Sequence, residues 1–324
     1  MKKKRKFSFL ILIVIMDVLI TGLSLVMGCL TYSSNTKKIQ QNDASIRLTN
    51  LTGNIRYALS FIGEIEKYYG LHGALVDAKE EMPRFQDLYV LDRDGNVISA
   101  TSDEELSLRV KRMTPGTNRV QGRQFICVFS LTDGANLVSV EDASPIFEKE
   151  QSYFPKLILI AVIGFLATGA IMSIFWVLVK KEKPRRAILI LILGAWVMLF
   201  GAFVGVTSAK DYSNSLTTLN GIIEEAFEQD IATLQEEGVP ISSISDFDSY
   251  LSRYTENIPE IEKIVYKNDG LVFTRSDNYI RSVYLDYALQ TLLSLMFTGM
   301  ILAEYTIFLA KTREEEGKEE QDAA

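Results

Sequence analysis

The feature that most limits what this chain can fold into is a set of four long apolar runs within its 324 residues. These runs are residues 7–31, 157–179, 187–208 and 288–310. Each exceeds the roughly 20 residues that a helix needs to cross a bilayer, because a helix rises about 1.5 Å per residue. We therefore expect four transmembrane helices, with the lipid bilayer as their surroundings.

Basic residues predict the side of the membrane on which each connection lies. Lysine and arginine cluster in residues 2–6, 180–186 and 311–313, and short basic segments stay on the cytoplasmic side. We expect a multi-pass protein of the cell membrane, with both termini in the cytoplasm. The N-terminus (1–6), the basic loop (180–186) and the acidic tail (311–324) are then cytoplasmic, whereas residues 32–156, the first polar segment, and 209–287, the second polar segment, are extracytoplasmic.

Charge and residue usage argue against several other classes of protein. The net charge of −7 leaves no basic surface for nucleic acid once the membrane-flanking clusters are set aside. Cys29 and Cys127 make no disulfide framework, and with His72 as the single histidine we predict no metal and no other cofactor. Cys29 ends a stretch similar to a lipoprotein cleavage box, but the preceding run is longer than the apolar region of a signal peptide. A retained span is favoured, and lipidation of Cys29 stays open.

The two polar segments share an internal repeat. Residues 81–98 align with residues 257–273, and in both a proline precedes an apolar strand. An Asp-Gly pair follows that strand in each, as Asp94-Gly95 and as Asp269-Gly270. The second polar segment is shorter. We expect it to be a reduced copy that completes its sheet against the first or against a second subunit.

The periodicity of the first polar segment predicts an α+β domain with one long helix and about five antiparallel strands. The helix continues the first apolar run and ends at Gly70, with a shorter helix over 75–81. Its apolar seam alternates spacings of four and three: Ala44, Leu48, Leu51, Ile55, Ala58, Ile62, Ile65 and Tyr69. Strands are expected at 87–92, 96–100, 106–112, 124–131 and 136–141. The second segment has a helical stripe between Leu216 and Ile231 and one hairpin, 264–267 with 271–274.

A membrane-proximal helix, the strand Leu88-Tyr89-Val90-Leu91-Asp92, then Asp94-Gly95 and Asn96-Val97-Ile98, resembles the Cache domains. These are PAS-like extracytoplasmic sensors of bacterial receptors. The resemblance covers about residues 36–150 and implies a small-molecule pocket between the sheet and its helices. The aromatic-arginine signature of the amino-acid-binding members is not found here. Only residues 312–324 follow Lys311, so we expect signal output through a separate protein partner.

Five residues are candidates for binding that small molecule. Arg119 and Arg123 lie between the expected third and fourth strands and would suit an anionic ligand. Tyr89, Phe125 and Phe129 alternate on strands and could form the apolar wall of the same pocket. A solvated loop beside an ordinary core is the alternative, and it is favoured, because any half-buried strand shows this alternation.

Asp92 and Asp94 resemble the opening of an EF-hand calcium loop. The glutamate at the twelfth position of such a loop is missing, and so are further acidic ligands. Asp and Gly also suit a tight turn between two strands. The turn interpretation is therefore favoured.

Two carboxylates and two glycines stand out inside the apolar runs. A charge near the middle of a membrane helix costs roughly 2.5–3.5 kcal/mol on insertion scales, so Asp17 and Glu304 are expected to face protein, water or a partner. Glu304 is near enough to the end of its run to extend to the interface instead. Gly201 and Gly205 form a GxxxG pattern that allows close helix packing, within one chain or in a homodimer.

Two hypotheses of function come from these observations. The leading one is a sensory or accessory membrane protein whose outer domain binds a small molecule and signals through a separate partner. The alternative is a structural or assembly subunit with protein-binding outer domains. A transporter is less favoured because the two repeats have the same orientation. An enzyme is not predicted, since no nucleophile and base pair is found.

Overall fold

The computed structural model describes residues 2–132, 134–178, 182–236, 238, 247–255, 258, 260–267, 270–277, 281, 284–286, 288–289, 291–293, 295–297, 299–300 and 303. The chain packs as two compact units. One, the apolar unit, consists of Met1–Tyr32, Gln151–Lys210 and Arg281–Ala324. The other, the polar unit, consists of Ser33–Glu150 and Asp211–Ile280, so it contains most of both polar segments.

Three helices within the described residues are long and apolar enough to cross a membrane. They are α1 (Lys2–Arg47), α5 (Ser144–Leu178) and α6 (Glu182–Glu236). All three continue beyond the predicted spans into the polar segments, and α5 does so although Pro155 lies inside it. About half of the fourth apolar run, 288–310, lies outside the described residues, and this span stays a prediction.

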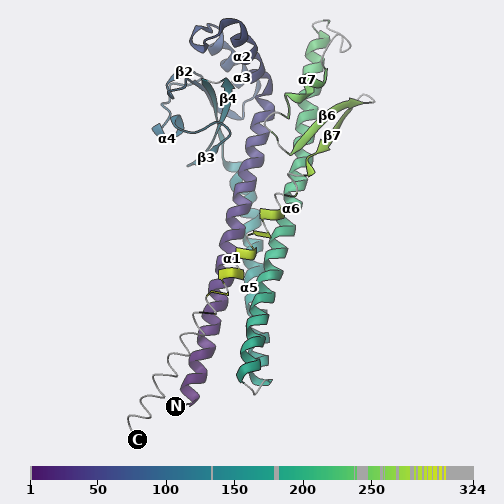
Figure 1. Ribbon diagram of the computed structural model, residues 1–324. Helices are drawn as coiled ribbons and strands as arrows, with labels where there is room; N and C mark the ends of the chain where they lie inside the picture. Colours follow the sequence, from purple (N-terminus) through teal and green to yellow (C-terminus); the bar gives the residue numbers. More distant parts are fainter. Residues whose placement is uncertain are drawn as a thin grey trace. The chain divides into compact units, whose positions relative to one another are not determined.

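The polar unit contains a five-stranded antiparallel sheet (Figure 1). Its strands are β1 (Phe85–Leu91), β2 (Val97–Ala100), β3 (Asn118–Gln121), β4 (Gln124–Thr132) and β5 (Ala135–Asp142). The order across the sheet is β2-β1-β5-β4-β3, which places β5 at the centre. The register there pairs Tyr89 with Val138 and Cys127 with Ser139. The protein is therefore a mixed helix and sheet structure, as the periodicity predicts.

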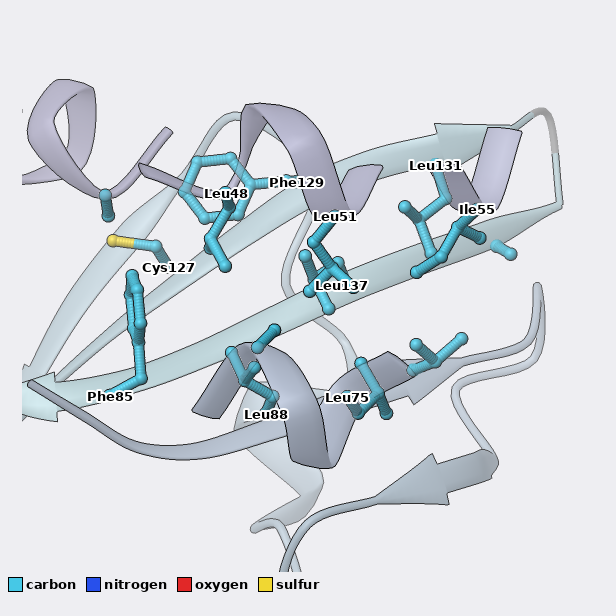
Figure 2. Close-up of a cluster of buried hydrophobic side chains, with 14 of the residues drawn as sticks. Leu48, Leu51, Ile55, Leu75, Phe85, Leu88, Cys127, Phe129, Leu131 and Leu137 are labelled. Carbon is cyan, nitrogen blue, oxygen red and sulfur yellow. The ribbon is translucent and has the colours of Figure 1, made fainter. Parts of the chain in front are cut away.

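One face of the sheet is covered by helices. These are the end of α1, α2 (Thr49–Ile62), the 3₁₀ helix η1 (Ile65–Lys67) and α3 (Leu71–Glu81). In Figure 2, Leu51 and Ile55 lie over Leu137 and Leu131 of the sheet, while Phe85 and Cys127 lie together at one end. The apolar stripe of the helices and the inward residues of the strands form one continuous core, whose burial is the main stabilising contribution.

The long seam helix is shorter than predicted. Helix α2 ends at Ile62, because Gly63 takes a positive φ of 82° and its N–H bonds to the carbonyl oxygen of Leu59. Tyr69, predicted on the buried seam, is fully exposed. The predicted end at Gly70 is wrong, since a glycine in the left-handed conformation stops the helix one turn after its last buried residue, Leu59.

The expected third strand, 106–112, is also wrong. These residues contain a single helical turn, α4 (Leu108–Lys111), and the third strand is Asn118–Gln121 instead. Apolar residues alternate here, but the turn buries Val110 against the sheet and leaves Leu108 exposed. Leu106, which precedes this turn, and Met113, which follows it, pack against the same cluster.

The second polar segment forms its own small sheet. Strands β6 (Ile261–Lys267) and β7 (Gly270–Arg275) make the predicted hairpin, and α7 (Phe247–Ser252) precedes them. Within the described residues these strands pair only with each other, so the hairpin does not extend the five-stranded sheet. A two-stranded hairpin alone is only marginally stable. In this one, the side chains of Ile261 and Ile264 are buried.

Candidate functional site

The five predicted ligand residues do not form one pocket. Phe125 and Phe129 belong to the core under the helices, whereas Tyr89 lies on the opposite face with Ile126 and Val128. The predicted common wall is therefore wrong. Successive residues of a strand point to opposite faces, and only the register between strands decides which residues of different strands share one.

The two arginines are exposed, as the alternative of a solvated loop requires. Arg119 pairs with Ile126 across β3 and β4, which puts it on the same face as Tyr89. Arg123 follows Gly122 in the turn between β3 and β4. Arg119 therefore lies on the same face as Tyr89 but on the edge strand β3, with β4 and β5 between it and β1.

On the face that carries Tyr89, one pair of polar groups lies among apolar side chains. The hydroxyl of Tyr89 lies 2.9 Å from Oγ of Ser102. Burial raises the pKa of Tyr89, so the phenol stays protonated. Val110 of α4, with Leu106 and Met113, packs against this face. Tyr89 itself is buried. We call the sheet face that carries Tyr89, Ser102 and Arg119 the Tyr89 surface.

Asp92 is a turn residue and not the start of a calcium loop. Its Oδ1 accepts hydrogen bonds of 2.8 Å from the backbone N–H groups of Asp94 and Asn96. Its Oδ2 accepts a third bond of 2.8 Å, from Nδ2 of Asn96. The side-chain bond of Asn96 and these backbone bonds hold the pKa of Asp92 below its usual value. Both carboxylate oxygens therefore act within the β1–β2 turn.

A buried charged network joins α1 to the sheet. Arg84 directly precedes β1, and its Nη2 lies 2.5 Å from Oε2 of Glu141 at the end of β5. Its Nη1 pairs with Asp43 of α1. Gln40 of α1 donates from Nε2 to the same Glu141 oxygen at 3.1 Å. We call these four residues the Arg84 network.

Electrostatics explain why the Arg84 network is charged. Burial alone would lower the pKa of Arg84, but the adjacent carboxylates of Glu141 and Asp43 raise it. Burial raises the pKa of Glu141 more than Arg84 and Gln40 lower it. Burial also raises the pKa of the nearby Cys127 thiol, which makes it unreactive. Arg84 therefore stabilises two carboxylates that would be costly to bury alone.

The second polar segment contains a similar buried carboxylate. Glu260 directly precedes β6 and is fully buried. Tyr212 of α6 donates a hydrogen bond to it, and Nζ of Lys38 of α1 lies 3.7 Å away. A second link lies farther along, where Asn50 of α2 donates to Asp230 of α6 at 2.5 Å. Both polar segments therefore contact α1 and α2, the helices with which the first polar segment begins.

In the apolar unit, Asp17 of α1 is buried among helices. Thr21 lies one turn away, and its hydroxyl donates to Asp17 at 3.4 Å. Nε1 of Trp196 on α6 donates to the Thr21 hydroxyl at 3.0 Å. The ring of Trp196 lies directly against Gly164 of α5, where a side chain would overlap it. Asp17 faces protein, one of its three expected surroundings.

Of the remaining predicted residues, all but one lie within the described part of the chain. A Cβ at Gly201 would lie 2.5 Å from Oγ1 of Thr291 in the same chain, so this glycine allows a close helix approach. Gly205 is buried. Cys29 and Cys127 form no disulfide. Glu304 lies outside the described residues.

Sequence reasoning missed the Arg84 network. One signal could have found part of it: Glu141 has the same strand parity as Leu137 and Ser139, so it faces the helices. The repeat alignment also places Arg84 and Glu260 at the same position after a proline. Comparison with protein-family models, with curated proteins and with solved structures gives no match to this chain.

Proposed function

We propose that this chain is a multi-pass sensory or accessory protein of the cell membrane, with both termini in the cytoplasm. Its extracytoplasmic domain is Cache-like, binds a small molecule and signals through a separate protein partner. The observation that supports this most is the attachment of α1 to the sheet. Helix α1 contains an apolar span and, without a break, the residues that bond to the Arg84 network.

This attachment has the physical form that a signalling helix needs. Gln40, Gln41 and Asp43 all contact the sheet domain, and Gln41 accepts a 2.6 Å bond from Asn118 of β3. A change of the sheet therefore acts on α1 through directed polar bonds, whose geometry is less tolerant of displacement than an apolar contact. Helix-covered sheet and long helix together agree with the resemblance to Cache domains.

The ligand is best sought at the Tyr89 surface. It combines an arginine that can bind a carboxylate with a protonated phenol and a serine hydroxyl. On the opposite face, core side chains such as Phe125 and Leu137 lie under the helices, and the polar groups of the Arg84 network are already bonded to one another. We therefore favour a small anionic or zwitterionic metabolite as the ligand.

A thermal-shift screen of the full chain in detergent tests this proposal. Amino acids, carboxylates, amines and nucleobases are added in turn, because a ligand that binds only the folded state raises the melting temperature. We expect one saturable rise in the carboxylate or amino-acid class. Arg119→Gln should remove it, and Arg93→Gln, an exposed arginine in the β1–β2 turn, should keep it.

The alternative, an assembly subunit with protein-binding outer domains, is supported by an exposed aromatic group. Tyr57, Phe61 and Tyr69 are all largely exposed, and the rings of Tyr57 and Phe61 lie 5.0 Å apart. Exposed apolar groups of this kind often mark protein contacts. Absence of a shift with every ligand class would contradict the sensor proposal and favour this one.

A further inference from the structure

Arg84 and Glu260 occupy equivalent positions of the internal repeat but carry opposite charges. Each directly follows the proline that precedes its hairpin. The backbone repeats too: the N–H of Phe85 bonds to the Met82 oxygen at 3.0 Å, and that of Ile261 to the Ile258 oxygen at 3.1 Å. The same local turn therefore presents a cation in one copy and an anion in the other.

Both residues contact the same helix. Arg84 pairs with Asp43 of α1 and Glu260 pairs with Lys38 of α1. Five helical positions separate Lys38 from Asp43, which corresponds to about 7.5 Å along the axis and about 140° around it. The two hairpins therefore contact different sides of one helix, with ion pairs of opposite polarity.

The two ion pairs differ in how well their charges are satisfied. Arg84 has carboxylate partners on two sides, Glu141 and Asp43. Glu260 is 0% exposed, and its cation Lys38 is 38% exposed and 3.7 Å away. One oxygen of each buried carboxylate, Oε2 of Glu260 and Oε1 of Glu141, has no hydrogen-bond partner within the described residues. A buried carboxylate is costly unless a close cation offsets it. Nη2 of Arg84 lies 2.5 Å from Glu141, so the ion pair at Glu260 is the weaker of the two.

We propose that the second polar segment is a reversible clamp on α1, held by the Lys38–Glu260 ion pair, while Arg84 fixes the same helix to the five-stranded sheet. Separation of Lys38 from Glu260 lets the carboxylate gain water and releases α1 together with the sheet domain. The second segment is then a regulatory part and needs no ligand of its own. The biological role of this clamp rests on the proposed signalling function. Its opening and closing take place in the ligand-free protein and can be measured there.

Hydrogen exchange of the ligand-free full chain in lipid nanodiscs tests the clamp. Lys38→Met keeps the length of the side chain and removes its charge, so the buried Glu260 loses the cation that it has within the described residues. We expect amides of β6 and β7 to exchange at least about tenfold faster, because removing one partner of a buried pair is strongly destabilising. Amides of β4 and β5 should exchange at the wild-type rate.

A second substitution makes the test specific. Glu260→Gln removes the buried charge and retains an acceptor for Tyr212, so Lys38→Met in that background should have little effect. Lys37→Met, the same change one position earlier on α1, is the matched control and should leave β6 and β7 unchanged. The clamp proposal would be overturned if β6 and β7 amides of Lys38→Met exchanged at the wild-type rate. It would also be overturned if Glu260→Gln failed to suppress the effect of Lys38→Met.

Two further outcomes also test the clamp proposal. If Lys38→Met does not fold, folding of the double variant supports the clamp, and failure of the double variant overturns it. The result is independent of the ligand screen: a clamp that responds to Lys38→Met in a protein without a detectable ligand would contradict only the proposed sensing function.

Discussion

Gly95 shows how one residue closes the hairpin of β1 and β2. Its φ of 84° is a conformation that residues with a side chain rarely adopt, and a Cβ there would lie 2.6 Å from the carbonyl oxygen of Lys111. We expect Gly95→Ala to destabilise the protein by about 1–3 kcal/mol. Denaturation of the full chain in detergent measures this.

Gly116 supplies the matched control for Gly95. Its φ is 79°, but a Cβ there would meet nothing within 4 Å. Gly116→Ala should therefore introduce backbone strain alone and cause a smaller loss of stability than Gly95→Ala. Equal losses for both variants would mean that the approach of Lys111 has no effect on stability.

Arg84 is the residue on which the charged network depends. Arg84→Met leaves Glu141 and Asp43 without their shared cation, and we expect a loss of roughly 3–5 kcal/mol near neutral pH. Arg93→Met, an exposed arginine, should have almost no effect. Denaturation of both variants across a pH series tests this.

The pH dependence of the Arg84 variant follows from Glu141. Because the folded-state pKa of Glu141 is raised, its protonated form favours the fold: this contribution is complete below the unfolded value near 4.5 and is lost as pH rises through the folded value. Without Arg84 the raised pKa should move higher. The deficit of Arg84→Met should therefore shrink as pH falls toward 4.5, and a deficit independent of pH would contradict a charged network.

At the scale of elements, helix packing in the apolar unit depends on one small residue. The ring of Trp196 on α6 occupies the space where Gly164 of α5 lacks a side chain. Gly164→Ala should overpack this contact and destabilise the unit by roughly 1–3 kcal/mol. The temperature at which the detergent-solubilised protein loses its monodisperse elution peak measures the effect.

Gly169 on the same helix is the control for this packing. A Cβ there would meet nothing within 4 Å, so Gly169→Ala should be neutral or slightly stabilising. If Gly164→Ala is equally harmless, α5 and α6 do not pack through Trp196.

At the scale of the whole molecule, the proposed topology predicts which residues are reachable from outside the cell. Single cysteines are introduced by Glu66→Cys, Glu225→Cys and Lys183→Cys into a chain carrying Cys29→Ser and Cys127→Ala. A membrane-impermeant maleimide should label the first two in intact cells, and Lys183→Cys only after permeabilisation. Labelling of only one polar segment would contradict two spans between them.

Much of the secondary structure could be predicted because it depends on local periodicity. Strands β1, β4 and β5 begin and end near their predicted limits, since alternation persists over several residues in each. The segment 106–112 was too short for periodicity to distinguish a strand from a helical turn. The helix end at Gly63 depends on one backbone conformation that no spacing of apolar residues reports.

The candidate site was less predictable because its partners are distant in sequence. Arg84 is 41 residues from Asp43 and 57 from Glu141. Tyr89 and Phe125 are both apolar strand residues, yet the register places them on opposite faces. A shift of one residue would exchange the faces, and sequence spacing alone does not fix that register.

The sequence by itself therefore determined the apolar runs, the two-part repeat and the hairpins, because hydropathy, periodicity and turn chemistry act between near neighbours. Only the tertiary structure decided which face Tyr89 joins, that Arg84 and Glu260 contact one helix, and that the second hairpin stays apart from the main sheet. Those outcomes depend on strand register and on burial of charges, which are set only when distant parts of the chain pack together.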